Sequence, residues 1–344
     1  MEAIVQTDKE AVEVQQRERP EPGSGEVLVD VHAAGLCGSD AHAYKIMDGY
    51  EWIPVPRIMG HEYSGRVAAV GEGVTDFEAG DKVVEAPIHD CGHCFQCLNG
   101  QSNVCQNFQI TGMHHDGAFT EARTVEHQYL HQVPDDVPLT RASLTEPLSI
   151  ATRAVIDRSR IEPGSHVLVE GPGPIGVLAA MVADSIGARV TVSGMERDAA
   201  HRLPIVADLG IETINIEDED EVLDARTDAV TVGGGWDVII DTTGHRTGIE
   251  MATEQIRRGG QIVIVGLPGA PSEVFMTPLV RGEIDITASY GSMWRNFEQA
   301  LRLISDGLPV DALQDHSYEV ATAADAFEDF LAGRTLKPVF HFDE

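Results

Sequence analysis

The chain has 344 residues, 42% of them apolar, which is enough for a sizeable core and predicts two domains or one large one. Its 24 basic residues stand against 56 acidic ones, a formal net charge of −32, so its surface should repel nucleic acid and anionic membranes. We expect a cytoplasmic protein, because no apolar run reaches roughly 18 residues and the charged N-terminus does not resemble a signal peptide.

Short β-strands are predicted for the first part of the chain, where β-branched runs are bounded by Gly, Pro and Asp. From Leu139 to Arg160 the apolar period becomes helical. The strand-like runs are Gly25–Cys37, Tyr63–Gly71, Gly80–Pro87 and Gly117–Pro134.

Strands and helices alternate in the next part, which predicts a parallel sheet with helices on both faces. The predicted strands are His166–Glu170, Arg189–Gly194, Ile214–Ile216, Trp236–Asp241 and Gly260–Gly266; the predicted helices are 173–188 and 197–210, the second kinked or shortened at Pro204. The tail adds a strand, helices and a final strand at 337–342. The simplest arrangement is an α/β fold in which a doubly wound parallel sheet, residues 151–280, is inserted in a β-rich domain formed by residues 1–150 and 281–344.

A glycine-rich turn directly follows the strand that ends at Glu170. Gly171, Gly173 and Gly176 stand in G-x-G-x-x-G register, with Pro174 and Ile175 opening a helix. Such glycines permit close backbone approach, and the helix N-terminus offers N–H groups to a pyrophosphate. The segment is therefore predicted to bind a dinucleotide in a Rossmann-type domain.

The choice between NAD and NADP depends on the end of the second strand, where NAD-binding chains carry an acidic residue. Gly194 occupies that position, and Glu196 and Arg197 follow it. Glycine with a nearby arginine favours NADP, although Glu196 could still serve a ribose hydroxyl and leaves NAD open. Further candidate cofactor contacts follow later strands: Thr242, Gly266 and Tyr290.

Four of the five cysteines are clustered, and an odd count without a signal peptide argues against a disulfide framework. Cys91, Cys94, Cys97 and Cys105 form a C-x2-C-x2-C-x7-C set in a lobe of about residues 88–107, able to close a four-thiolate zinc site. An iron–sulfur cluster could use similar spacing, and C-x-x-C redox chemistry is a further alternative. Cys37 stands alone.

The order of these motifs resembles the zinc-dependent medium-chain dehydrogenase/reductase family across essentially the whole chain. The matching motifs are Cys37, Gly60-His61-Glu62, the four-cysteine lobe, Glu146-Pro147 and the glycine loop. The resemblance implies a GroES-like catalytic domain, a structural zinc in the lobe and a catalytic zinc at Cys37 and His61.

The same resemblance assigns roles around the catalytic zinc. Glu62 and Glu146 are the other candidate ligands, which could exchange as substrate enters, and Asp40 orients His61. Ser39 takes the proton of the alcohol, and His42 passes it to solvent.

The substrate is less constrained. The run beginning Glu146-Pro147-Leu148-Ser149 resembles the sorbitol, iditol and xylitol dehydrogenases, which favours a polyol or similar secondary alcohol, while L-threonine 3-dehydrogenases and glucose dehydrogenases stay open. A non-catalytic zinc module would leave Cys37, His61 and Glu146 unused, and a zinc-free quinone-reductase relative would lack the cysteine lobe. The family also implies a homotetramer or homodimer. Few lysines and many carboxylates resemble proteins of salt-accumulating halophiles.

Overall fold

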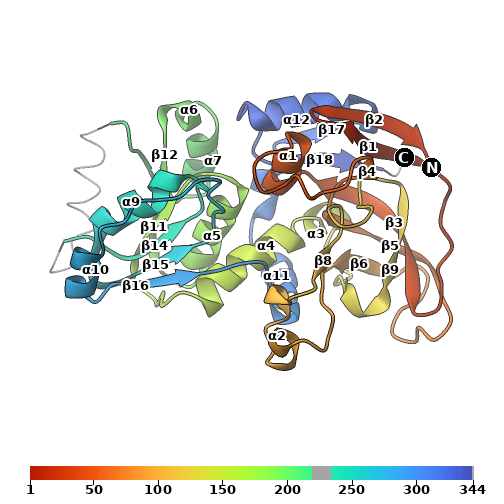
Figure 1. Ribbon diagram of the computed structural model, residues 1–344, viewed down its shortest axis with the longest axis horizontal. Coiled ribbons are helices and arrows are strands. Elements are labelled where there is room, and N and C mark those ends of the chain that lie inside the picture. Colours follow the sequence, from red (N-terminus) through yellow and green to blue (C-terminus); the bar gives the residue numbers. More distant parts are fainter. Residues whose placement is uncertain (219–233, 343–344) are drawn as a thin grey trace. The chain divides into compact units, whose positions relative to one another are not determined.

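The computed structural model describes residues 1–218 and 234–342. The chain divides into two compact units, one formed by Met1–Ser149 with Gly291–Glu344 and the other by Ile150–Tyr290 (Figure 1). Within the described ranges, every helix is too short or too polar to cross a membrane.

The first unit is built mainly on antiparallel strands, with β17 and β18 as a parallel pair. Its larger sheet has the order β10-β6-β5-β3-β18-β17, with β9 pairing to β3, and a smaller sheet has the order β2-β1-β4. The strands are β1 (Glu2–Asp8), β2 (Ala11–Gln16), β3 (Glu26–Gly35), β4 (Arg57–Ile58), β5 (Glu62–Val70), β6 (Lys82–Glu85), β7 (Ile88–His89), β8 (Gln109–Ile110), β9 (Ala122–Glu126), β10 (Leu130–Gln132), β17 (His316–Tyr318) and β18 (Pro338–His341). The helices are α1 (Gly38–Tyr44), α2 (Phe95–Leu98), α3 (Leu139–Ala142), α4 (Thr145–Thr152), α11 (Trp294–Ser305) and α12 (Ala323–Leu331), of which α4 runs on into the second unit.

Strand β3 is the centre of the larger sheet and pairs antiparallel with β5, β9 and β18. Its alternating apolar side chains join a buried core to which α12 adds Ala326 and Phe327. The end of β3 lies opposite the start of β5, with Gly35 paired to Glu62. This register brings the residues just after β3 and just before β5, among them Cys37 and His61, to one edge of the sheet.

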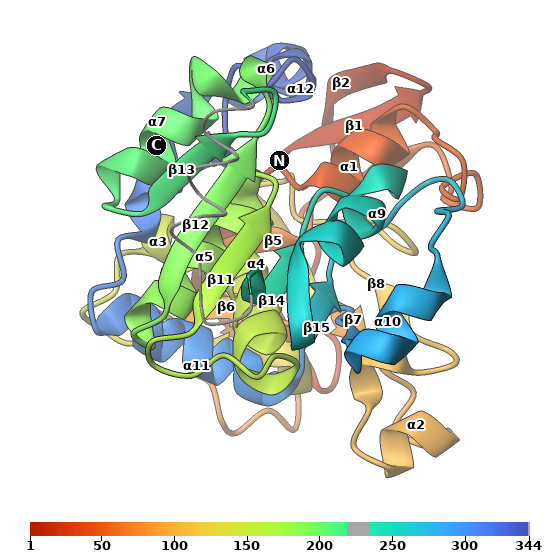
Figure 2. The same ribbon diagram turned by 90° about the vertical axis from the view of Figure 1, so that its left-hand side faces the viewer.

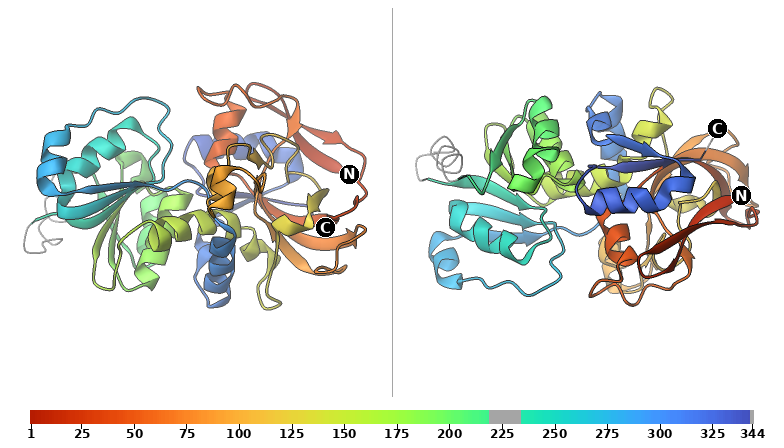
Figure 3. Two further views of the ribbon diagram at one scale, coloured as in Figure 1. Left: turned by 60° about the horizontal axis from the view of Figure 1, so that its bottom comes forward. Right: turned by 90° about the horizontal axis from the view of Figure 1, so that it is seen from above.

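The second unit holds a parallel sheet of order β13-β12-β11-β14-β15-β16. Figure 2 shows β13, β12, β11, β14 and β15 side by side, and Figure 3 shows α9 and α10 on one face of the sheet with α5 on the other. The strands are β11 (His166–Glu170), β12 (Arg189–Gly194), β13 (Glu212–Asn215), β14 (Trp236–Asp241), β15 (Ile256–Ile264) and β16 (Asp285–Ala288); the helices are α5 (Pro174–Ser185), α6 (Glu196–Ala199), α7 (Arg202–Asp208), α9 (Arg246–Gln255) and α10 (Met276–Gly282). The order reverses at β11 and β14, so the predicted doubly wound sheet is confirmed.

Three details differ from the sequence-based expectation. The second unit extends to Tyr290 rather than 280, because β16 pairs with β15 and completes the sheet. The predicted helix 197–210 is two helices, and Pro204 lies in the first turn of α7, where its missing N–H costs nothing. The helical stretch 139–160 is divided into α3, α4 and a π-helical turn, Arg153–Asp157.

Candidate metal centre and cofactor site

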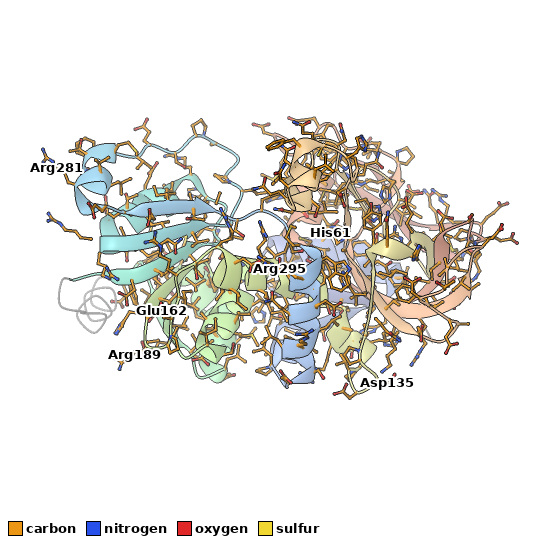
Figure 4. The ribbon with its side chains drawn as sticks, turned by 90° about the horizontal axis from the view of Figure 1, so that it is seen from below. His61, Asp135, Glu162, Arg189, Arg281 and Arg295 are labelled. Atoms are coloured by element: carbon orange, nitrogen blue, oxygen red, sulfur yellow. The ribbon has the colours of Figure 1, made fainter. Side chains whose placement is uncertain are left out.

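Cys37 and His61 meet at the edge where β3 ends and β5 begins. Cys37 is the N-cap residue of α1, and the backbone N–H of Cys37 donates to Asp40 Oδ2 at 3.0 Å. Asp40 Oδ1 lies 3.5 Å from His61 Nδ1, and both side chains are buried. Figure 4 labels His61. One carboxylate therefore fixes the start of α1 and orients the His61 ring.

The Asp40 carboxylate also controls the charge on His61. Burial alone would lower the pKa of His61, but Asp40 and Cys37 raise it well above its usual value. Burial raises the pKa of Asp40, and the attraction of His61 more than reverses this, so its pKa is lowered. With Nδ1 turned to Asp40, the other ring nitrogen, Nε2, faces Ser39 Oγ at 3.4 Å.

Two buried glutamates border this pair. Glu62 is fully buried and forms an ion pair with the buried Lys337. Glu146, in the first turn of α4, is 9% exposed, and its pKa is raised to about 7 by burial and by Glu62, against the opposing influence of His61 and Lys337.

The donor set suits a zinc ion. One ligand atom each from Cys37, His61 and Glu62 lies within 4.8 Å of the others. Glu62 Oε2 is paired with Lys337, whereas Glu62 Oε1 has no hydrogen-bond partner within the described residues. Thiolate, imidazole and carboxylate are the ligands of catalytic zinc sites, which keep a position open. Glu146 lies outside this group, although the charges of Glu62 and His61 both act on it.

Ser39 and His42 lie three residues apart on α1, so their side chains share one face of the helix. The His42 ring stands edge-on to Tyr50, with 5.4 Å between centroids. Burial and the positive charge of Lys45 lower the pKa of His42. A neutral imidazole beside the serine can accept a proton.

The four clustered cysteines converge on one point, as their spacing predicts. Their sulfur atoms lie 3.4 Å (Cys94–Cys97), 3.7 Å (Cys94–Cys105) and 3.5 Å (Cys91–Cys105) apart. These separations are too long for disulfides and near the edge of about 3.8 Å for a tetrahedron with zinc–sulfur bonds of about 2.3 Å. Backbone N–H groups, chiefly those of His93 and Cys97, lower the pKa values of Cys91 and Cys94 and favour thiolates.

The glycine loop has the geometry that a dinucleotide requires. Gly171 has a φ of 99°, and a Cβ at Gly176 would lie 1.9 Å from the carbonyl oxygen of Gly171. Gly173 is the N-cap of α5, Pro174 and Ile175 form its first turn, and a Cβ at Gly173 would meet nothing within 4 Å. The helix N-terminus is therefore open to a pyrophosphate.

Gly194 is the last residue of β12, as predicted. A Cβ there would lie 2.9 Å from Leu203 Cδ2 and 3.1 Å from Pro172 Cγ. Glu196 and Arg197 lie in α6, and the Arg197 side chain is 78% exposed.

Two carboxylates also lie at this end of the sheet. Glu217 Oε2 accepts a hydrogen bond from the backbone N–H of Glu196 at 2.7 Å, and Glu196 Oε2 accepts one from Asn215 Nδ2 at 2.7 Å.

The other predicted cofactor residues occupy different places in the second unit. Thr242 Oγ1 donates to the carbonyl oxygens of Glu170 and Gly171, at 2.8 and 3.1 Å, and so joins the end of β14 to the glycine loop. Gly266 lies where a Cβ would be 2.2 Å from the backbone nitrogen of Gly244. Tyr290 is half-buried at the end of the unit.

Sequence reasoning missed two buried charged residues. The sequence predicts only that Lys337, one of four lysines in the chain, lies in the final strand. It predicts that Glu170 ends a mostly apolar strand, where a carboxylate is either buried or at the edge of the sheet. The rarity of lysine in the chain and the position of Glu170 at the end of a strand are the only sequence signals that point to these two residues.

Comparisons with known proteins agree with this geometry. Residues 23–135 match the alcohol dehydrogenase GroES-like domain, and residues 174–306 match the zinc-binding dehydrogenase domain. The chain is 37% identical to a 2-dehydro-3-deoxy-L-galactonate 5-dehydrogenase of Pseudoalteromonas atlantica, over 83% of this chain and 82% of the relative. It is 32% identical to a sorbitol dehydrogenase of Halalkalibacterium halodurans, over 98% of both chains.

Two solved structures with bound cofactor superpose along almost the whole chain. An Escherichia coli alcohol dehydrogenase in complex with NADH has a TM-score of 0.89 and 29% identity, with 99% of both chains covered. A zinc-binding dehydrogenase of Sinorhizobium meliloti bound to NADP has a TM-score of 0.91 and 27% identity, covering 99% of this chain and 98% of that one.

Proposed function

Since the chain belongs to the zinc-dependent medium-chain alcohol dehydrogenase family, and is thus an NAD(P)-dependent oxidoreductase, we propose that it interconverts a secondary alcohol of a polyol or sugar derivative and the ketone. The observation that carries the proposal is the convergence of Cys37, His61 and Glu62. A catalytic zinc would be held there by Cys37, His61 and either Glu62 or Glu146, and a structural zinc by the four clustered cysteines.

Bound zinc would lower the pKa of the substrate hydroxyl, and bound nicotinamide would accept the hydride. The chain's own residues position these groups and move the proton. Ser39 Oγ, beside His61, accepts the hydroxyl proton as it gives up its own, and His42 on the same helix face passes the released proton to solvent. Asp40 keeps the His61 ring oriented.

Replacement of the two central ligands tests the assignment. Cys37→Ser and His61→Ala should each lose one zinc per chain and reduce kcat/KM by at least about 1000-fold, because the group that stabilises the developing charge is gone. His127→Ala removes a more exposed histidine of the same unit and is the matched control. Near-normal turnover in either ligand variant would refute the site.

The substrate class rests on the relatives and on one motif. Ser149, where threonine dehydrogenases usually carry glycine after the Glu-Pro-Leu run, is buried, and its hydroxyl donates to the carbonyl oxygen of Glu146 at 2.6 Å. It stabilises the turn that carries Glu146 and favours the polyol branch. Sugar acids are also candidate substrates, because the 37% identical relative is a dehydrogenase of a sugar acid.

A substrate panel separates these possibilities. Sorbitol, xylitol, galactonate, glucose and L-threonine should be assayed with both cofactors in molar KCl, and we expect the polyols or the sugar acid to give the highest kcat/KM. Activity confined to threonine would move the enzyme to the threonine branch, and activity confined to glucose would make it an aldose 1-dehydrogenase.

For the cofactor we favour NADP. The position at the end of β12, where NAD-binding chains carry an acidic residue, is Gly194, and the surrounding side chains leave no space for a larger residue there. The exposed Arg197 can reach a 2′-phosphate. Arg197→Ala should lower kcat/KM for NADP about tenfold and leave NAD unchanged, because a charge-assisted hydrogen bond is lost; Arg189→Ala, at the start of β12, is the control. A strict requirement for NAD would assign the ribose to Glu196 or Glu217 instead.

The family and the amino-acid composition also support a proposal about the location, the oligomeric state and the source of the protein. We expect a cytoplasmic homotetramer or homodimer from a salt-accumulating halophile. Light scattering in molar KCl measures the assembly directly, and a monomer there would contradict the family-based expectation.

A further inference from the structure

Lys337 is a fully buried cation beside the candidate metal centre. Its side chain is 1% exposed, although it is the residue just before β18. Its ammonium forms an ion pair with Glu62 Oε2 and donates a hydrogen bond to the carbonyl oxygen of Leu36 at 3.1 Å. Leu36 immediately precedes Cys37, so the lysine contacts both strand ends that carry the metal ligands.

The fold brings this pair together across a glycine. Gly35 is paired with Glu62 of β5 on one side and with Val339 of β18 on the other. A Cβ at Gly35 would lie 3.0 Å from Glu62 Oε2 and 3.1 Å from Lys337 Cε. The absence of a side chain at Gly35 therefore leaves the space in which Lys337 reaches Glu62.

The groups nearest Lys337 are the candidate metal ligands. The ammonium forms an ion pair with Glu62, and Cys37 and Glu146 also attract its positive charge. A metal held by Cys37, His61 and Glu62 would therefore share the Glu62 carboxylate with the ammonium.

We propose that Lys337 is a positioning residue that competes with the metal for Glu62 and so keeps this carboxylate a displaceable zinc ligand. The inference rests on the proposed metal site at Cys37 and His61. When the ammonium holds one oxygen of Glu62, the charge available to the metal is reduced. The open position that substrate needs can then form without loss of the zinc.

The test measures zinc release and ligand geometry rather than turnover. Zinc transfer to a colorimetric chelator is followed for the wild type, Lys337→Met and Lys337→Met/Glu62→Gln, and the visible spectrum of each Co²⁺-substituted form is recorded. Cys37→Ser identifies the phase that belongs to the catalytic site. Lys82→Met is the matched control, because Lys82 also donates to backbone carbonyls, those of Asp135 and Val137, but lies in another part of the sheet.

We expect Lys337→Met to slow the Cys37-dependent phase about tenfold or more and to shift the Co²⁺ spectrum, with Lys82→Met unchanged. Adding Glu62→Gln to Lys337→Met should abolish the slowing. This comparison between the single and the double variant remains valid if Lys337→Met lowers the stability of the protein. An unchanged or faster phase in Lys337→Met, or slowing that persists without the Glu62 carboxylate, would overturn the inference. A wild type without any Cys37-dependent phase would instead refute the proposed metal site itself.

Discussion

Glu170 and Asp241 place two carboxyl groups side by side at the carboxyl edge of the parallel sheet. They are register partners in β11 and β14, and both are buried. Asp241 accepts hydrogen bonds from the backbone and hydroxyl of Thr243, whereas neither carboxyl oxygen of Glu170 has a hydrogen-bond partner within the described residues. Burial, and then Asp241, raise the pKa of Glu170 to about 9.

Replacing Glu170 with Gln should stabilise the protein at pH 8. Between its ordinary pKa of 4.5 and its folded value of about 9, Glu170 is ionised only in the unfolded chain. Unfolding then releases a proton, so stability falls by up to about 1.4 kcal/mol per pH unit and levels off above pH 9. Glu170→Gln removes this loss and should gain about 2–4 kcal/mol at pH 8 and almost nothing at pH 5.

Denaturant unfolding of the wild type and Glu170→Gln at both pH values measures this difference. Glu162→Gln, which changes an exposed carboxylate of the same unit (Figure 4), should leave the pH dependence as it is. Parallel pH profiles for the wild type and Glu170→Gln would mean that the Glu170 carboxyl is ionised in the folded protein.

At the scale of elements, two glycines in the turn between β11 and α5 should have different roles. Gly176 is needed for the fold, and Gly173 is needed for binding of the dinucleotide. Gly176→Ala drives a methyl group into the carbonyl of Gly171 and towards Thr242, so we expect a loss of several kcal/mol of stability or no folding. Gly173→Ala meets no atom, so the fold should persist. Its effect should be on the dissociation constant of the dinucleotide, measured by fluorescence titration beside thermal unfolding. Equal stability of the two variants would contradict the close approach of Gly176 to the carbonyl oxygen of Gly171.

The four-cysteine lobe is the second element with a distinct expectation. A zinc bound by these four thiolates, as proposed, would have no open position and could not activate an alcohol, so its role would be to fold the lobe. Cys97→Ser should lose one zinc and lower the Tm by about 5 °C or more, while kcat of the folded fraction stays near that of the wild type. Zinc content and calorimetry measure this. A Tm unchanged after loss of this zinc would remove the structural role.

At the scale of the whole molecule, a net charge of −32 makes stability depend on salt. Repulsion among surface carboxylates is screened as the Debye length falls from about 10 Å at 0.1 M to about 3 Å at 1 M. The Tm should therefore rise by about 5 °C or more between 0.1 and 2 M KCl. Sucrose at equal osmolality tests for exclusion effects without screening. An equal gain in sucrose would contradict the electrostatic explanation.

Much of this architecture could be predicted because its signals are local. The strands at 166–170 and 236–241, the glycine loop and the cysteine spacing are each set by neighbouring residues, and the structure has them where they were expected. The extent of the second unit was underestimated, because β16 is recognised only through its pairing with β15. Helix 197–210 was too long for a similar reason, since the break after Ala199 leaves no strong mark in the sequence.

The sequence by itself determined the family, through the order of its motifs along the chain. It also determined the four-cysteine cluster and the glycine loop, because covalent spacing places the members of each within a few residues of one another. Only the tertiary structure decided which charges face each other. Lys337 and Leu36 are 301 positions apart, and they meet because β18 pairs with β3. Glu170 and Asp241 become neighbours because two parallel strands share a register. Strand pairing, which no local pattern encodes, sets the electrostatics of both sites.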